Sequence, residues 1–155
     1  MRSKAAIHGH PVHPILVTIP IGAFVGSAIG DVLYAVGGQE HWFEFSRLAI
    51  SIGLLAAPLA AIAGLVDYFG LRLPPAAARV ATFHLGFNVV ALLFYSISLV
   101  LRWHRPPLVE GGWGWAMTMS TLGLAVLGAS GWLGGKLVFE HHVGVLEGDG
   151  EAARS

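Results

Sequence analysis

The chain has 155 residues, of which 55% are hydrophobic and only 12% are charged, whereas an ordinary soluble domain carries about 25% charged residues. Nine basic residues balance nine acidic ones, so the chain has no positive excess with which to hold a nucleic acid backbone. The lack of cysteine excludes disulfide bonds, cysteine-ligated zinc, iron–sulfur clusters and covalently attached c-type haem.

Four stretches with almost no charged residues predict helices that cross a lipid bilayer. A helix needs roughly 20 mostly apolar residues to span the hydrocarbon, and in lipid each segment must satisfy its own backbone hydrogen bonds. The stretches are residues 14–36, which include Asp31, and the runs between Arg47 and Asp67, between Arg79 and Arg102, and between Glu110 and Lys136. The basic start of the chain resembles a signal peptide, but it lacks a convincing cleavage site, so we expect a retained first helix.

These helices predict an all-α, up-down-up-down transmembrane bundle, because the connections between them are short. Side A denotes the membrane face that carries the N-terminus, the start of the third helix and the ends of the second and fourth helices; side B is the opposite face. We expect residues 1–146 to form one domain and residues 147–155 a mobile polar tail, and we find no internal repeat in the sequence. Four tryptophans fall at side B, where aromatic rings favour the headgroup region: Trp42, Trp103, Trp113 and Trp115.

The basic residues predict the orientation of the bundle. Six of them lie on side A (Arg2, Lys4, Arg72, Arg79, Lys136, Arg154) and three on side B (Arg47, Arg102, Arg105). Cytoplasmic loops carry the excess of Lys and Arg, so we expect side A, with both termini, to face the cytoplasm. Asp31, near side B, is expected to be an interfacial charge.

Six of the eight histidines collect at side A: His8, His10, His13, His84, His141 and His142. Interfacial histidines often bind only headgroups or water, but ionisable groups in a membrane are costly and usually have partners or functions. His84 lies inside an apolar run, and Asn88 and Tyr95 continue the same helix face. We expect this polar stripe to point into the bundle, either as a hydrogen-bond network or as part of a binding site.

Two further side chains reach side A. Pro14 suits a first helical turn and holds His13 near the helix N-terminus, where the dipole favours a neutral imidazole that can bind a metal. Asp67 ends the second helix, where it could ligate a metal, accept a hydrogen bond from a ligand imidazole, or pair with Arg72 or Arg79.

Small-residue faces on two helices allow two interpretations. Gly22, Gly26 and Gly30 form one face, and Gly131 and Gly135 form another. Such faces let helices pack closely in lipid, and they could equally border a planar cofactor.

Four segments together resemble the bacterial membrane family known as domain of unknown function 2231. They are GHPVHPILVTIPIG, GLVDY, HLGFN and GGKLVFEHHVGV, and the resemblance covers roughly residues 9–145. It places the polar positions of the family on His10, His13, Asp67, His84, Asn88 and His141. Thr18 stands where many members have a histidine, and His142 stands where glycine is usual. The resemblance implies a multi-pass protein of the bacterial inner membrane with a redox link, because related domains occur beside Rieske-type iron–sulfur domains.

A b-type haem protein that transfers electrons is the first functional hypothesis. Haem iron takes one or two axial ligands, and two imidazoles give a centre suited to electron transfer. The first and third helices of the bundle are diagonal neighbours, so His13 and His84 could approach iron from opposite sides. His10 or His141 would then be substitute ligands or partners of the haem propionates, and a Rieske-type domain is a candidate redox partner.

A non-haem site for zinc, copper or iron is the alternative hypothesis. Imidazole ligates all three metals, and several of His10, His13, His84 and His141, with Asp67, could form such a site. An open coordination position would activate water for hydrolysis, although the sequence assigns no catalytic residue. A third hypothesis is a structural membrane subunit without a cofactor. The glycine faces could also join two copies of the chain as a homo-oligomer.

Overall fold

The structure is a computed structural model that describes residues 1–104 and 112–145. Within these residues it contains five helices, α1 (Val12–Leu16), α2 (Thr18–Gly37), α3 (Glu40–Gly70), α4 (Pro75–His104) and α5 (Gly112–Phe139). A short hairpin of β1 (Ala6–Ile7) and β2 (His10–Pro11) precedes them. Helices α1 and α2 form one span, so the described residues hold four segments that are long and apolar enough to cross a membrane.

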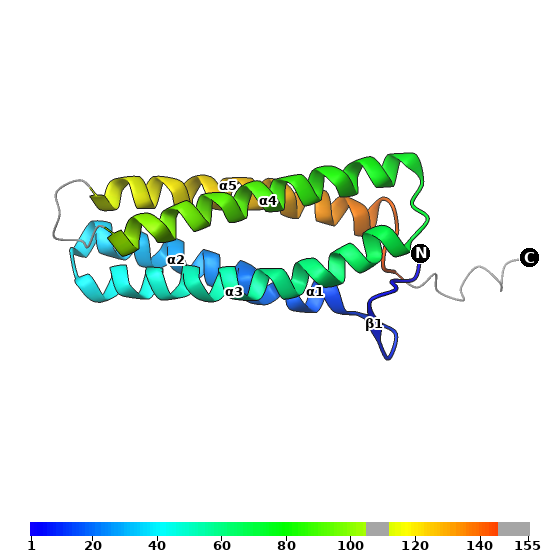
Figure 1. The fold of residues 1–155 in the computed structure, drawn as a ribbon, viewed down its shortest axis with the longest axis horizontal. Coiled ribbons are helices and arrows are strands. Elements are labelled where there is room, and N and C mark those ends of the chain that lie inside the picture. Colours follow the sequence, from blue (N-terminus) through cyan, green and yellow to red (C-terminus); the bar gives the residue numbers. More distant parts are fainter. Residues whose placement is uncertain (105–111, 146–155) are drawn as a thin grey trace, which may run out of the picture.

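The spans alternate in direction along the chain, which confirms the up-down-up-down bundle (Figure 1). The first span (α1 and α2) and α3 form one antiparallel pair, the first hairpin. Helices α4 and α5 form the second hairpin. Contacts are dense within each pair and sparse between the pairs. The first span lies against α3 and α5, so α4 is its diagonal neighbour, as predicted. The N-terminus, the start of α4 and the ends of α3 and α5 lie together at side A (Figure 1).

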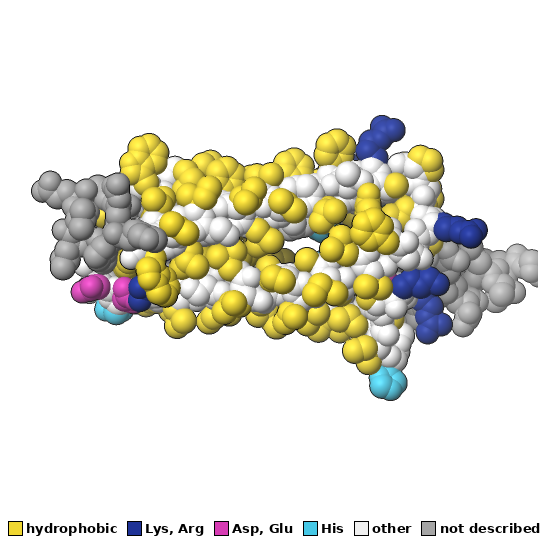
Figure 2. All heavy atoms as spheres, in the orientation of Figure 1, with side chains coloured by type: hydrophobic (Ala, Val, Ile, Leu, Met, Phe, Trp, Pro, Cys, Tyr) yellow, Lys and Arg dark blue, Asp and Glu magenta, His cyan; other side chains and the backbone are white. Residues whose placement is uncertain are grey.

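Large apolar side chains cover the outside of the bundle, whereas most buried positions carry small residues (Figure 2). Leu55 on α3, for example, is 78% exposed. Such a surface suits lipid, in which helices associate through close packing of small residues. Basic side chains gather at the side A end in Figure 2. The predicted tail, residues 147–155, lies outside the described residues.

Proline and glycine set several helix boundaries. The first span is interrupted at Val17, because Pro20 has no N–H to donate to the carbonyl of Leu16. Gly38 ends α2 in the left-handed conformation, and its N–H donates to the carbonyl of Tyr34 at 2.8 Å. Pro75 begins α4, where its fixed φ and missing N–H suit the first helical position.

The N-terminal hairpin was not expected from the sequence. His8 and Gly9 both have positive φ, 49° and 84°, and they connect two antiparallel strands in which Ile7 pairs with His10. Positive φ at both central residues is typical of the two-residue type I′ turn. The hairpin projects from the side A end of the bundle (Figure 1).

Toward side B, the space between the two hairpins is closed by buried side chains. Phe24 on α2 and Tyr95 on α4 stack with ring centres 3.8 Å apart. Nearer side B, Nη2 of Arg102 donates to Oδ2 of Asp31 at 2.7 Å, and the Ser120 hydroxyl donates to the same oxygen. Asp31 is only 5% exposed, so the expectation of an interfacial charge was wrong: its partner lies on a helix distant in sequence.

Of the glycine face of α2, Gly26 and Gly30 pack against α3, whereas Gly22 is exposed with no atom within 4 Å of an added Cβ. A Cβ at Gly30 would lie 2.9 Å from the Phe45 ring and 3.1 Å from the Trp42 carbonyl oxygen, both on α3. At Gly26 the nearest atom would also belong to Phe45. On α5, by contrast, Gly131 lines a cavity between the hairpins.

Candidate cofactor site

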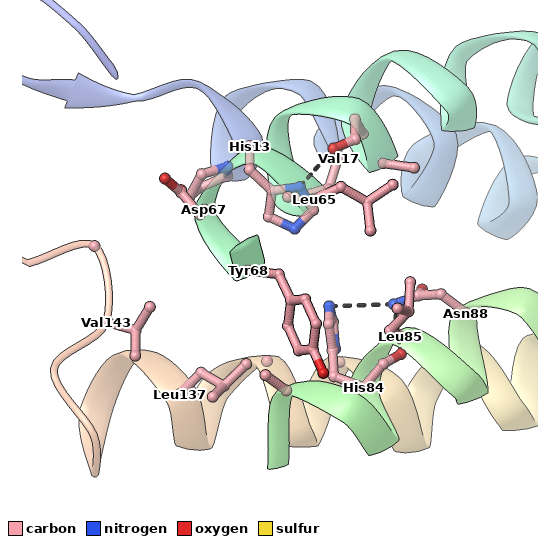
Figure 3. Close-up of a pocket in the computed structure, with 18 of the residues that line it drawn as sticks. His13, Val17, Leu65, Asp67, Tyr68, His84, Leu85, Asn88, Leu137 and Val143 are labelled. Carbon is pink, nitrogen blue, oxygen red and sulfur yellow. Dashed lines mark hydrogen bonds between the residues drawn. The ribbon is translucent and has the colours of Figure 1, made fainter. Parts of the chain in front are cut away.

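A cavity of about 250 Å³ lies between the two hairpins, in the half of the bundle toward side A. All four spans contribute to its wall, which reaches from Pro11 and Val143 near side A to Phe24. Figure 2 shows a hollow between the two layers of helices. The wall is mostly apolar, and its polar side chains are those of His13, Asp67, Tyr68, His84 and Asn88 (Figure 3).

His13 projects from α1 into the cavity and is held by α3. Its Nδ1 lies 2.7 Å from the carbonyl oxygen of Ala60. A carbonyl oxygen can only accept, so Nδ1 carries the proton and donates it. In the neutral ring, Nε2 therefore keeps a free lone pair. Metal-ligating histidines are usually oriented by such a bond from the other ring nitrogen.

His84 on α4 is held in the same way by α5. Its Nδ1 lies 2.9 Å from the carbonyl oxygen of Ser130 and therefore donates to it. Nδ2 of Asn88 lies 2.9 Å from the His84 carbonyl oxygen and 3.1 Å from Nε2 of His84. Because Nδ2 donates to that carbonyl, it is also the donor toward Nε2, so Nε2 is unprotonated. Both histidines are thus arranged with the proton on Nδ1.

Each imidazole lies against a glycine that follows, by one helical turn, the carbonyl to which it is bonded. A Cβ at Gly64 would lie 3.0 Å from Nδ1 of His13, and a Cβ at Gly134 would lie 3.2 Å from Cε1 of His84. A Cβ at either position would require the ring to shift by a few tenths of an ångström from the place where its carbonyl partner holds it. The two glycines therefore provide the space in which the rings are seated.

The two imidazoles face each other across the cavity (Figure 3). Their ring centres are 6.3 Å apart, and their planes are nearly perpendicular, at 87°. His13 comes from the first hairpin's layer and His84 from the second's. The polar stripe of His84, Asn88 and Tyr95 points into the bundle as predicted, since all three side chains are buried or half-buried between helices.

Asp67 is bound to the N-terminal segment. The Ser3 hydroxyl donates to its carboxylate at 2.7 Å, and the backbone N–H groups of Lys4 and Ala5 donate at 2.6 and 3.0 Å. In Figure 3 the carboxylate is turned away from the two imidazoles. Its partners are therefore neither an imidazole nor one of the two arginines weighed from the sequence, and it holds the N-terminal segment against the end of α3.

The remaining predicted ligands lie outside the histidine pair. His10 is exposed on the N-terminal hairpin, and its ring bonds to a carbonyl of the same hairpin. His141 lies in the turn after α5 and does not line the cavity. Within residues 1–104 and 112–145, no three His, Asp or Glu side chains are grouped so that they could hold a metal ion. Of the five predicted ligands, the structure pairs only His13 and His84.

Sequence reasoning missed the groups that orient these two rings. Ala60 acts through its backbone carbonyl, which no side-chain pattern reveals. Gly64 and Gly134 were detectable, because each lies near the side A end of the helix that packs against a histidine-bearing helix.

The Tyr68 hydroxyl lies 2.8 Å from the Thr82 hydroxyl and joins α3 to α4 beside the site.

The comparisons agree with this architecture. The family described as "Predicted membrane protein (DUF2231)" matches residues 9–147. No curated protein and no solved structure matches the chain. The chain is a multi-pass membrane protein and belongs to this family, as its sequence resemblance indicated.

Proposed function

We propose that the protein binds a b-type haem between its two hairpins, with His13 and His84 as axial ligands, and that it transfers electrons at the membrane. One observation carries the proposal: two imidazoles from opposite layers face each other, and each is oriented by an Nδ1–H bond to a backbone carbonyl. This leaves the Nε2 atoms as the groups that can ligate a metal.

The spacing of the rings supports two ligands on one iron. A metal bonds to an imidazole nitrogen at about 2.0–2.1 Å, and the ring centre lies roughly 1.1 Å beyond, so two opposed imidazoles place their ring centres roughly 6.3 Å apart. The observed separation is 6.3 Å. A bis-histidine haem would supply one-electron transfer without an open coordination position.

The cavity wall also supports a planar, mostly apolar ligand. Its lining is mainly aliphatic and aromatic. Its volume of about 250 Å³ is below the range of about 300–1,000 Å³ that is typical of ligand sites. The cavity would therefore have to widen around the edge of a haem while the two imidazoles keep their spacing, and the sparse contacts between the hairpins leave room for such a movement. Exposed cations at the side A end, Lys4, Arg72 and Arg79, could then neutralise carboxylates of the ligand.

The protein's own groups would have distinct tasks in such a site. The carbonyls of Ala60 and Ser130 fix the Nδ1 protons and hence the direction of each Nε2. If Nε2 of His84 were a ligand, Asn88 would lose its bond to that nitrogen and could keep its bond to the His84 carbonyl. Phe24, which stacks on Tyr95, lines the cavity toward side B.

A non-haem metal site is less well supported, because zinc and similar ions in proteins usually take three or four protein ligands. In the described part of the chain, two imidazoles face the cavity without a third such group beside them. The chemistry is therefore better suited to a metal whose other ligands come from a macrocycle.

We further propose that side A faces the cytoplasm of a bacterial cell, with the protein in the inner membrane. Exposed basic residues at side A support this orientation. A redox partner, such as a Rieske-type domain, would then dock at side A, because the cavity lies closest to that face.

An absorbance spectrum tests the proposal directly. The protein is expressed with adequate haem supply, purified in mild detergent, and measured oxidised and dithionite-reduced, with parallel elemental analysis. We expect a Soret band and sharp reduced α and β bands, which are lost in His13→Ala and His84→Ala.

His10→Ala and His141→Ala are matched controls, since both histidines lie outside the pair and should leave the spectrum unchanged. A stoichiometric metal without a Soret band would favour the non-haem site. If haem-replete preparations contain neither, the proposal fails and the structural-subunit hypothesis takes its place.

A further inference from the structure

The contacts around the two histidines occur twice, at a constant spacing in the chain. His13 binds the carbonyl of Ala60 and lies against Gly64; His84 binds the carbonyl of Ser130 and lies against Gly134. The histidines are 71 residues apart, and their partners on the following helix are 70 apart. Each hairpin thus contains the same local arrangement.

The correspondence continues toward side B. Eleven residues after each histidine stands an aromatic ring, Phe24 or Tyr95, and the two rings stack on each other. Each ring also lies against a glycine of its own hairpin: a Cβ at Gly53 would lie 2.5 Å from the Phe24 ring, and one at Gly123 would lie 3.0 Å from the Tyr95 ring. These glycines are again 70 residues apart.

A third level repeats nearer side B. In the first hairpin the Ser46 hydroxyl donates to the Ser27 carbonyl at 3.0 Å. In the second hairpin the Ser98 hydroxyl donates to the Ala116 carbonyl at 2.7 Å. Ser27 and Ser98 are again 71 residues apart, and Ser46 and Ala116 are 70 apart. The donor is on the second helix of the first hairpin but on the first helix of the second hairpin. Both hairpins thus have a serine–carbonyl hydrogen bond at this point, but its direction between the two helices is reversed.

Both hairpins begin at side A, so they are related by a rotation about the long axis of the bundle (Figure 1). Membrane proteins built from parallel repeats have such an axis along the membrane normal. Equivalent residues face each other across this axis, as the pairs His13–His84 and Phe24–Tyr95 do.

We infer that the chain is a tandem duplication of a two-helix hairpin whose halves associate across a pseudo-two-fold axis. The Asp31–Arg102 ion pair makes a first hairpin associate with a second hairpin rather than with another first hairpin. The surface involved is the inner face of each hairpin, which packs against the other hairpin of the same chain. The same face of the first hairpin also fits the second hairpin of another copy of the chain. This inference is independent of haem binding.

Asp31 and Arg102 occupy equivalent positions, since each lies seven residues after the stacked ring of its hairpin. Their side chains are 6% and 0% exposed. If two first hairpins paired, Asp would face Asp, and if two second hairpins paired, Arg would face Arg. Buried like charges are strongly unfavourable, so only the unlike pairing gives each charge a counter-ion. The ion pairs Glu44–Arg47 and Lys136–Glu140 each join neighbouring turns within one hairpin and are partly exposed.

The pseudo-symmetry predicts that the two charges can be exchanged. Arg102 is supported from one turn earlier by the Ser98 hydroxyl, 3.2 Å from its Nε. Ser27 stands at the equivalent place before position 31, so an arginine introduced there would find a hydroxyl one turn earlier. We therefore expect the double variant Asp31→Arg/Arg102→Asp to recover folded protein that each single variant loses in detergent size-exclusion chromatography. Recovery should stay below wild type, because Ser120, which donates to Asp31, has Ile50 as its counterpart in the first hairpin.

Co-expression of the two single variants with different affinity tags tests partner selection in full-length chains. Asp31→Arg and Arg102→Asp each place like charges together within one chain. If the copies exchange hairpins, both ion pairs of the resulting dimer become complementary. We expect the second tag to co-purify at least about tenfold more than in a wild-type pair. Glu44→Arg co-expressed with Arg47→Glu is the matched control and should show no increase.

Two results would overturn the inference. If the exchanged double variant is as unstable as the single variants, the two positions are not equivalent across an axis. If co-expressed single variants co-purify no better than wild-type copies, the ion pair does not select the partner hairpin.

Discussion

The two ends of the space between the hairpins contrast in how their polar groups are satisfied. Toward side B, Asp31, Arg102 and Ser120 bond to one another with no room between them. Toward side A, His13 and His84 bond to backbone carbonyls and face a cavity. At the closed end the ion pair joins the hairpins, although Nη1 of Arg102 has no hydrogen-bond partner among the described residues. At the open end each imidazole is held through Nδ1 and lines the cavity, which is the arrangement that a ligand site would need.

The largest effect is expected from removing one charge at the closed end. Arg102→Ala leaves the Asp31 carboxylate buried without its cation, and loss of one member of a buried pair costs about 3–5 kcal/mol. The free energy of unfolding in mixed detergent and SDS measures this. Arg47→Ala is the control: the partly exposed pair with Glu44 is worth at most about 1 kcal/mol. If both variants lost the same free energy of unfolding, the Asp31–Arg102 pair would not be the main interaction that holds the hairpins together.

A smaller effect is expected at the boundary between the two ends. In Gly53→Ala the new methyl group would lie 2.5 Å from the Phe24 ring, and overpacking of this kind costs about 1–3 kcal/mol. Gly22→Ala has no atom within 4 Å of the added Cβ and should stabilise α2 by roughly 0.5–1 kcal/mol. Thermal unfolding of both variants in the same detergent compares them. Similar melting temperatures would contradict tight packing around the Phe24–Tyr95 stack.

The smallest effect is expected at the open end. Asn88→Val places at position 88 the residue found at the equivalent position 17 of the first hairpin. It removes the donor to Nε2 and to the carbonyl of His84, so the unfolding free energy should fall by about 0.5–1.5 kcal/mol. The Soret band should remain, because Nε2 of His84 stays available. Loss of haem as complete as in His84→Ala would make Asn88 part of the binding site.

The fold was predictable from sequence because the membrane imposes it. Uncharged runs located all four spans, although the helices extend further than these runs: α3 begins at Glu40, seven residues before Arg47. Charged residues end the contact with lipid without ending the helix. The diagonal placement of His13 and His84 followed from the order of the spans alone.

The site was predictable only in part, because its partners depend on packing between distant segments. The sequence predicts Asp31 to be an interfacial charge, because it does not show that α4 places Arg102 beside it. It predicts Asp67 to be a possible ligand, because it does not show that the N-terminal segment supplies three hydrogen-bond donors to this carboxylate. The sequence alone does not reveal the inferred duplication, because few residues match between the two hairpins: they share glycines and contact points more than side chains.

The Phe24–Tyr95 stack has a consequence for energy conversion. Phe24 of this stack lines the cavity, and the buried Asp31–Arg102 pair lies beyond the stack toward side B. The proposed cofactor, on the side A side of this stack, would exchange electrons and protons with the aqueous compartment at side A only. Turnover at such a centre would move no charge across the bilayer, so its rate should be insensitive to the membrane voltage.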